Sequence, residues 1–232
     1  MIEEVLTLYK EALIDTDHDK ALSVIRDAVR KGISPEDAVF KVVVPCMEWM
    51  AKYLYDTLNS NIAQHFMTAQ ISADVCEEMI SSFKHPPAAI GTVVVGTSPG
   101  DVHSFGKRIL IGCLKAIMID VVDLGLNVAP ERFVDEAVAH NAQVIAISSM
   151  MLHTARGDNG CLKVRQILKE RGLQDSIKII VGGAPYRFDP ELYIQVGADA
   201  CAPDALAAGR IITGLIKEAL INERRLPQEV ER

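Results

Sequence analysis

The chain has 232 residues, and its 31 Asp and Glu outnumber its 24 Lys and Arg, so its formal net charge at pH 7 is -7. No basic stripe interleaved with aromatic residues is present, so we expect no nucleic-acid partner. The first residues lack a secretion signal and no apolar run reaches membrane-spanning length, so we expect a cytoplasmic protein without a membrane partner. The five cysteines have no short paired spacing, which favours buried thiols over disulfides, zinc or an iron–sulfur cluster.

Residues 1–86 are predicted to form a separate domain, a bundle of four helices. Apolar residues recur at helical spacing over 2–13 and again over 22–29. A further helix start is indicated by Ser34 as the cap and Pro35 at the first helical position. Two consecutive prolines then break the last helix, and we place the domain boundary there.

Residues 87–232 alternate between apolar strands and amphipathic helices, which is typical of a parallel sheet covered on both faces. The predicted strands are 92–95, 127–128, 143–148, 178–181 and 199–201. The predicted helices are 107–124, 131–140, 159–171, 190–196 and a last helix from 204. The expected fold class is therefore α/β, with a helical bundle followed by a doubly wound, five-stranded parallel sheet.

Chemically informative residues lie where three of these strands end. Asp101 and His103 follow the first strand, Ser148 closes the third, and a Gly182-Gly183 pair follows the fourth. In an open parallel sheet these strand ends share one edge, where ligands bind. Asp101 can hold one imidazole nitrogen of His103 while the other nitrogen binds a metal. The alternatives are a solvated loop histidine beside an aspartate, and an ordinary tight turn at the glycines.

The residues at these strand ends also match a family signature. They read Asp101-x-His103-x-x-Gly106, then Ser148-x-Met150, then Gly182-Gly183. This order resembles the signature shared by cobalamin-dependent methionine synthase and the corrinoid methyl-carrier proteins of methanogens and acetogens. The similarity extends over nearly the whole chain, since those carriers place a four-helix bundle ahead of a Rossmann-like (flavodoxin-like) domain. It implies a helical cap domain over 1–86 and a cobalamin-binding domain over 87–232.

The resemblance implies a role for each matching residue. His103 would replace the benzimidazole of the corrinoid as the lower axial ligand of cobalt, which is base-off/His-on binding of cobalamin. Asp101 would hydrogen-bond His103, and Thr154 would continue that relay. Met150 replaces the usual Leu, a swap that conserves volume. The other implied residues would lie near the corrin ring or its inserted nucleotide tail: Val102, Ser104, Gly106, Ser148, Gly182, Gly183, Ala202 and Asp204.

On this resemblance we expect a corrinoid methyl carrier that is a non-catalytic subunit of a methyltransferase system. It would take a methyl group from a substrate-specific methyltransferase onto cobalt and present it to an acceptor methyltransferase. O-demethylation and the use of methylamines or methanol are examples of such one-carbon metabolism, and a corrinoid reactivating protein would be a further partner. The helical bundle would cap the upper face of the cofactor and shield the cobalt with Met47, Trp49, Tyr53 or Met67.

A cobalamin-dependent sensor is the main alternative. The stretch Ala63-Gln64-His65-Phe66, followed by Ala69, is similar to the Glu-His helix of cobalamin-dependent light sensors. Gln64 departs from the Glu, and a bond from His65 to cobalt would block methyl transfer, so the upper ligand distinguishes the two functions. Two further readings are disfavoured: a phosphoacceptor receiver needs an acidic residue at the end of the third strand, and a mutase small subunit would not carry the helical domain.

Overall fold

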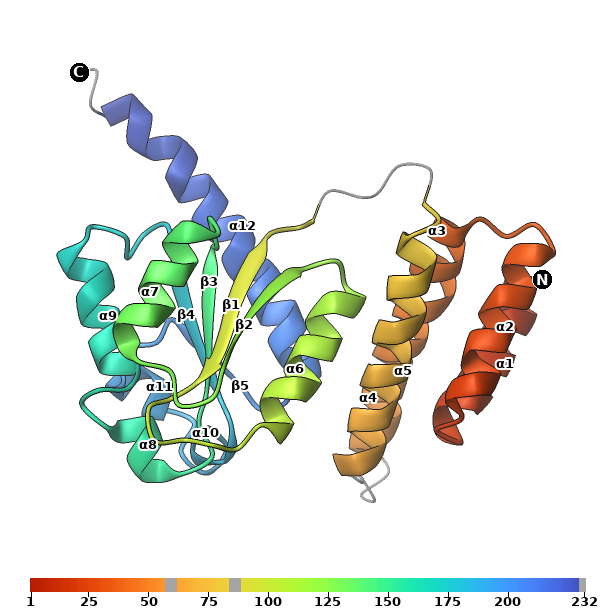
Figure 1. Cartoon of the computed structure of the whole chain (residues 1–232), viewed down its shortest axis with the longest axis horizontal. Helices are drawn as coiled ribbons and strands as arrows, with labels where there is room; N and C mark the ends of the chain where they lie inside the picture. Colours follow the sequence, from red (N-terminus) through yellow and green to blue (C-terminus); the bar gives the residue numbers. More distant parts are fainter. Residues whose placement is uncertain (57–61, 84–88, 230–232) are drawn as a thin grey trace. The chain divides into compact units, whose positions relative to one another are not determined.

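The computed structural model describes residues 1–56, 62–83 and 89–229, without the side chains of 48, 51, 52, 54–56, 62, 63, 65, 66, 206 and 223–229. The chain divides into two compact units (Figure 1). One comprises Met1–Ala88 with Lys115–Met118, and the other comprises Ala89–Leu114 with Ile119–Arg232. Among the described residues, no helix is long and apolar enough to cross a membrane.

The first unit is a bundle of four helical segments, as predicted. The segments are α1 (Ile2–Ile14), α2 (His18–Arg30), the continuous run of α3 (Pro35–Ala38), the π-helix η1 (Val39–Val43) and α4 (Val44–Asp56), and then α5 (Ile62–Ile80). The side chains of Tyr9, Leu13, Ile25 and Ile71 are almost completely buried in its core. Apolar residues at helical spacing therefore account for the bundle, because each helix has one face to bury.

Local sequence explains where two of these helices begin. The carboxylate of Asp17 accepts a hydrogen bond of 2.9 Å from the backbone N–H of Lys20 at the start of α2. The hydroxyl of Ser34 accepts one of 3.0 Å from the N–H of Asp37, with Pro35 at the first helical position of α3. Both contacts satisfy backbone donors that have no partner within the helix.

The second unit is built on a five-stranded parallel sheet in the order β2-β1-β3-β4-β5. The strands are β1 (Thr92–Thr97), β2 (Asp120–Gly125), β3 (Val144–Ser148), β4 (Lys178–Gly182) and β5 (Ala200–Ala202). The helices are α6 (Phe105–Ala116), α7 (Pro130–Ala139), α8 (Leu152–Arg156), α9 (Cys161–Glu170), α10 (Ala184–Phe188), α11 (Leu192–Gln195) and α12 (Ala205–Glu229). Figure 1 shows α7 and α9 on one face of the sheet and α6 and α12 on the other. This is the flavodoxin-like, doubly wound arrangement, so the predicted fold class is confirmed.

The prediction was wrong around the second strand. Helix α6 ends at Ala116, so the predicted helix over 107–124 is too long, and the predicted strand over 127–128 lies in a loop. The strand is β2, at the edge of the sheet, where only Leu124 is buried. An edge strand has one covered face, so exposed acidic residues alternate with its apolar ones. In this sequence that alternation follows the apolar pattern of the preceding helix without a break, so helix and strand were predicted as one long helix. The short helices α8 and α10 were not predicted.

Both faces of the sheet are covered, which explains the continuous apolar runs in its central strands. On one face Val94, Ile145 and Ile179 pack with Phe133 of α7 and Leu168 of α9 in a single buried cluster. On the other face α12 packs against β3, β4 and β5. The sheet is therefore a rigid platform, and the loops at the carboxyl ends of its strands are the places where polar side chains can gather.

Candidate cofactor site

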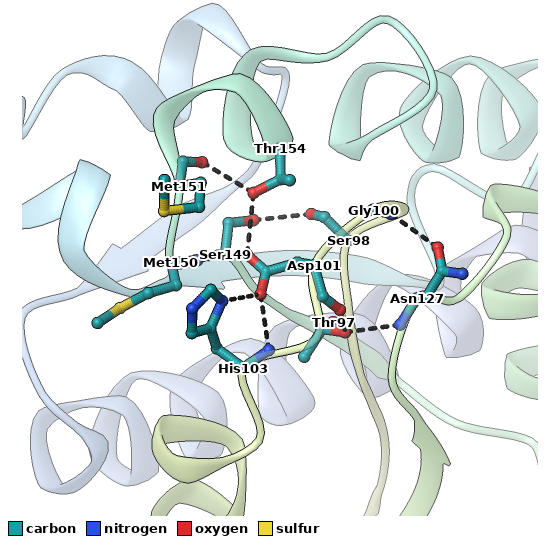
Figure 2. Close-up of polar contacts among 10 residues, drawn as sticks. All are labelled: Thr97, Ser98, Gly100, Asp101, His103, Asn127, Ser149, Met150, Met151 and Thr154. Atoms are coloured by element: carbon teal, nitrogen blue, oxygen red, sulfur yellow. Dashed lines mark hydrogen bonds and ion pairs between the residues drawn. The ribbon is translucent and has the colours of Figure 1, made fainter.

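The loops that follow β1 and β3 meet at the carboxyl edge of the sheet, because these two strands are neighbours (Figure 2). The loop after β1 opens with a turn in which the N–H of Asp101 donates to the carbonyl of Ser98 at 2.9 Å. Pro99 and Gly100 occupy its two central positions, and Gly100 has φ of +78°. A proline followed by a glycine with positive φ is typical of a type II turn. This turn places Asp101 beside the loop after β3, where its carboxylate accepts from the N–H of Met150.

Asp101 is the centre of the site, and it is only 1% exposed. Its Oδ1 accepts hydrogen bonds from the backbone N–H of His103 at 3.0 Å and from Nδ1 of the same residue at 2.9 Å. Its Oδ2 accepts from the N–H of Met150 at 2.6 Å and from the hydroxyl of Thr154 at 2.9 Å. Burial by itself raises the pKa of Asp101, but these four bonds outweigh it and lower the pKa to about 2. The carboxylate is therefore ionised at neutral pH.

The ionised carboxylate determines which imidazole nitrogen of His103 carries a proton. A carboxylate without a proton can only accept hydrogen bonds, so Nδ1 at 2.9 Å must be the donor. In a neutral imidazole Nε2 then has a free lone pair, and the side chain of His103 is 51% exposed. Within the described part of the chain, Nε2 makes no hydrogen bond. The predicted contact from Asp101 to His103 is thus present, and it leaves one ring nitrogen available as a ligand.

The donor set suits a metal whose other ligands come from a cofactor. The described residues include no group of three or more His, Cys, Asp or Glu side chains that could hold a metal ion. A protein-only centre of the usual three or four ligands is therefore not supplied by them. A single oriented imidazole at an open sheet edge would suit a metal whose remaining ligands a cofactor supplies. His103 therefore fits the role of a ligand to such a metal, and no second ligand from the described residues is needed.

Four small residues form a row across the carboxyl ends of β1, β3, β4 and β5. In the strand register Thr97 pairs with Ser148, Ser148 with Gly182, and Gly182 with Ala202. Their neighbours in β3 and β4 face the core cluster beneath α7 and α9, so this row faces the layer of α6 and α12. The predicted Ser148, Gly182 and Ala202 are thus brought together, and sequence reasoning missed Thr97.

Two of the three predicted glycines, Gly106 and Gly183, differ in why the position holds a glycine. A Cβ atom on Gly106, in the first turn of α6, would meet no atom within 4 Å. A Cβ atom on Gly183 would lie 2.0 Å from the carbonyl oxygen of Ser149, and Gly183 has φ of +119°. The backbone of the protein itself therefore requires glycine at 183. None of the described residues requires glycine at 106, so that position leaves room for a bound group.

Large apolar side chains are exposed at the same edge of the sheet as His103. They lie in the loops after β1, β2 and β3 and at the first positions of α6 and α8, and comprise Val102, Phe105, Leu126, Met150, Met151 and Leu152. Scattered exposed apolar residues are ordinary, but several in loops at one sheet edge mark a surface that a ligand or partner covers. The predicted Val102 and Met150 are in this group, and the backbone N–H of Met150 also binds Asp101.

The remaining predicted residues lie at helix starts. The backbone carbonyl of Ser104 accepts from the N–H of Arg108 at 3.0 Å as α6 begins. Asp204 accepts from the N–H of Ala207 at 2.8 Å, so its carboxylate caps α12 directly after β5. Both residues are at the carboxyl edge, and both have a structural role there. Neither role requires a bound group.

Sequence reasoning missed three polar residues that hold the loops in place, besides Thr97. The hydroxyls of Ser98 and Ser149 are 2.7 Å apart and tie the β1 loop to the β3 loop. Asn127, after β2, binds the turn at Gly100 through its side chain at 2.7 Å. The available signals were the Thr-Ser pair at the end of β1 and an Asn directly after a Leu-Gly-Leu run. Asn127 was missed because that segment was assigned to a strand.

The bundle residues proposed to shield cobalt differ in exposure. Met47 is buried in the first unit, whereas Tyr53 and Met67 are exposed. The rings of Trp49 and Tyr53 stack with centroids 5.0 Å apart, and Nζ of Lys10 lies 4.9 Å from the centroid of Trp49. The side chain of His65, on which the sensor alternative depends, lies outside the described residues.

Comparison with known proteins shows which family the sequence of this chain matches. The family described as "B12 binding domain" matches residues 91–209, just over half of the chain. Trimethylamine corrinoid protein 1 of Methanosarcina acetivorans is 32% identical over 201 residues, which are 85% of this chain and 90% of that protein.

Two solved structures share the fold. A cobalamin-binding protein from Desulfitobacterium hafniense has a TM-score of 0.73 at 22% identity and covers 90% of this chain and 98% of its own. A chain of the methanol:cobalamin methyltransferase complex MtaBC from Methanosarcina barkeri has a TM-score of 0.72 at 23% identity, over 95% of this chain and 84% of its own. The family match and the sequence relative decide the assignment. The chain belongs to the B12-binding-domain family.

Proposed function

We propose that this protein is a corrinoid methyl carrier that binds cobalamin base-off/His-on, with His103 as the lower axial ligand of cobalt. The observation that carries the proposal is the bond from Nδ1 of His103 to the buried, ionised Asp101, which leaves Nε2 free at the carboxyl edge of the sheet. When bound, the corrinoid supplies a cobalt ion that can accept and release a methyl group.

The residues of the chain bind and orient in this proposal. Asp101 keeps the proton on Nδ1, and this makes the lone pair of Nε2 more basic and so a better ligand for cobalt. The hydroxyl of Thr154 also donates to Asp101 and holds the carboxylate oxygen that does not face His103. The nucleotide tail would bind along the row of small residues that includes Ser148 and Gly182, and in the space beside Gly106. The exposed apolar loop residues would lie against the corrin ring.

The names of the relatives support a proposal for the partners and substrates. One relative is a trimethylamine corrinoid protein, and one structural neighbour belongs to a methanol:cobalamin methyltransferase complex. We infer that this chain is a non-catalytic subunit served by a substrate-specific methyltransferase and an acceptor methyltransferase, with a corrinoid reactivating protein. A methylamine or methanol is the class of methyl donor that these names support. The methyl-transfer steps would be catalysed by the partners.

The bundle has a separate part in the proposal. Residues 1–86 would be the removable cap, and residues 87–232 the cobalamin-binding domain. The stacked pair Trp49 and Tyr53, with the exposed Met67, supplies the apolar surface that shielding cobalt requires. Met47 is buried inside the bundle, so we leave it out of this role.

The test is reconstitution of the purified chain with hydroxocobalamin, reduction to Co(II) and EPR of wild type, His103→Ala and His153→Ala. His153 is the matched control, because it is an exposed histidine at the same sheet edge, next to Thr154. We expect nitrogen hyperfine splitting from one imidazole in wild type and in His153→Ala, and its loss in His103→Ala. Retention of the splitting in His103→Ala would overturn the proposal, and so would failure of wild type to retain a corrinoid.

A His65→Ala variant separates the carrier from the sensor. For a carrier, we expect its visible spectrum with methylcobalamin and adenosylcobalamin to equal that of wild type. A change in that spectrum would mean that a second imidazole reaches the upper face of the cofactor. The sensor function would then be favoured.

A further inference from the structure

Asn127 links the edge strand β2 to the turn that carries Asp101 (Figure 2). Its Oδ1 accepts a hydrogen bond of 2.7 Å from the N–H of Gly100. Its own N–H donates to the hydroxyl of Thr97 at 2.8 Å and to the carbonyl of Asp101 at 3.1 Å. The loop after β2 therefore binds the end of β1 and the last two residues of the turn, Gly100 and Asp101.

The contacts of Asn127 form a closed set around the backbone of Asp101. The hydroxyl of Thr97 donates to the carbonyl of Asp101 at 2.6 Å, and the N–H of Asn127 reaches the same two groups. The turn is thus held on its backbone side by Asn127 and Thr97, and the carboxylate of Asp101 faces the β3 loop and His103. If the hydrogen bonds to the backbone of Asp101 are lost, the position of its carboxylate becomes less well defined, and all four hydrogen bonds to the carboxylate are weakened.

The residue type at this position also has a conformational reason. Asn127 has φ of +51°, in the left-handed region that asparagine and aspartate tolerate better than other residues with a Cβ atom. Asn127 therefore combines two properties, a backbone shape and an oxygen acceptor for Gly100. Glycine would keep only the shape, aspartate would keep both, and alanine would keep neither.

We propose that Asn127 is a positioning residue for His103: by holding the turn at Gly100 and Asp101, it keeps the imidazole presented to the cofactor. This inference rests on the proposed function. Asn127 acts through Asp101, and its hydrogen bonds among the described residues go to Thr97, Gly100 and Asp101 and not to His103. Its effect is on the fraction of cofactor that carries the imidazole as a ligand, and not on the fold of the sheet below.

The chain supplies a matched control for the conformational part. Asn141 also has a left-handed backbone, with φ of +50°, and lies between α7 and β3 at the opposite edge of the sheet. Asn141→Gly and Asn141→Ala make the same backbone changes at a position that cannot reach the site. Any effect that the two positions share is a general cost of the substitution.

The experiment measures cobalamin affinity and the imidazole hyperfine splitting of Co(II) in Asn127→Asp, Asn127→Gly, Asn127→Ala and both Asn141 variants. Loss of one hydrogen bond at an exposed position predicts an affinity roughly threefold to fivefold weaker in Asn127→Gly. We expect a reduced fraction of imidazole-bound Co(II) in that variant, a larger reduction in Asn127→Ala, and values near wild type for Asn127→Asp. Both Asn141 variants should match wild type.

Amide hydrogen exchange on the protein without cofactor adds a readout that does not depend on cobalt. We expect faster exchange at Gly100 and Asp101 in Asn127→Gly, and unchanged exchange at these residues in Asn141→Gly. If Asn127→Ala does not fold, the Gly and Asp variants still decide the matter.

The outcomes separate this inference from the proposed function. If wild type shows the imidazole splitting and Asn127→Gly shows it to the same extent with the same affinity, the inference about Asn127 is wrong and the proposed function stands. If wild type binds no corrinoid, or binds it without the imidazole, the proposed function fails first. A partial loss in Asn127→Gly with rescue in Asn127→Asp supports both.

Discussion

The interior of the sheet and the Asp101 carboxylate at its carboxyl edge are both shielded from water, but they are stabilised in different ways. In the interior, Val94, Ile145 and Phe133 are apolar, so burial itself stabilises them. At the edge, Asp101 is equally buried and charged, and it is tolerated only because both of its oxygens accept hydrogen bonds. The interior therefore determines whether the domain folds, whereas the edge determines whether His103 is held in position to bind a ligand.

Removing a large side chain from the interior should have the largest effect on stability. Phe133 is fully buried against the sheet beside Gly96. Phe133→Ala should lower the free energy of unfolding by about 3 to 5 kcal/mol, measured by urea denaturation. Val138→Ala on the same helix, where Val138 is exposed, is the control and should cost less than about 0.5 kcal/mol. Equal costs for the two variants would contradict the described core.

Asp101→Asn should separate the two regions, because it keeps the shape of the side chain and removes the charge. An amide nitrogen cannot accept a hydrogen bond, so the donors on one side of the residue lose their acceptor. We expect a loss of about 2 to 3 kcal/mol in unfolding free energy, together with loss of the imidazole splitting. Asp189→Asn, in an exposed ion pair with Arg156, is the control and should cost less than about 1 kcal/mol. A variant that keeps full His103 ligation would argue against the role of Asp101.

The low pKa of Asp101 predicts how the protein without cofactor responds to acid. The pKa is about 2 in the folded chain and 3.8 ordinarily, so the folded state binds this proton less readily. The stabilisation is complete above about pH 4 and is lost as pH falls through about 2, a change of about 2 kcal/mol. The measurement is the unfolding free energy of wild type minus that of Asp101→Asn between pH 5 and 2. This difference should shrink as pH falls, and a constant difference would contradict the assignment.

The smallest effect on stability is expected at Gly106, and it should have the opposite sign. Alanine has the higher helix propensity, and outside its own helix its Cβ would meet no described atom within 4 Å, so Gly106→Ala should stabilise the cofactor-free chain by up to about 1 kcal/mol. If the nucleotide tail lies beside this position, the same variant should weaken cobalamin binding but not the binding of cobinamide, which lacks the tail. Gly183→Ala is the contrast, because it clashes with the backbone of Ser149 and should destabilise the chain. Unchanged cobalamin affinity in Gly106→Ala would place the tail elsewhere.

Most of the fold could be predicted from short-range patterns. The central strands β1, β3 and β4 are continuous apolar runs, and the bundle helices begin at clear caps such as Ser34. Strand β2 could not be predicted in this way. It lies at the edge of the sheet, and only its pairing with β1 makes Asp120–Gly125 a strand.

The contacts in the candidate site also differ in whether they could be predicted from short-range sequence patterns. The contact between Asp101 and His103 was predictable from the sequence alone, because the two residues are two positions apart and a carboxylate at that spacing reaches the imidazole. The bond from Thr154 to Asp101 was expected only through the family resemblance, since 53 positions separate the two residues. Asn127 was found only in the structure. Contacts between loops of different strands depend on strand order and register, and these are set by the packing of the whole sheet.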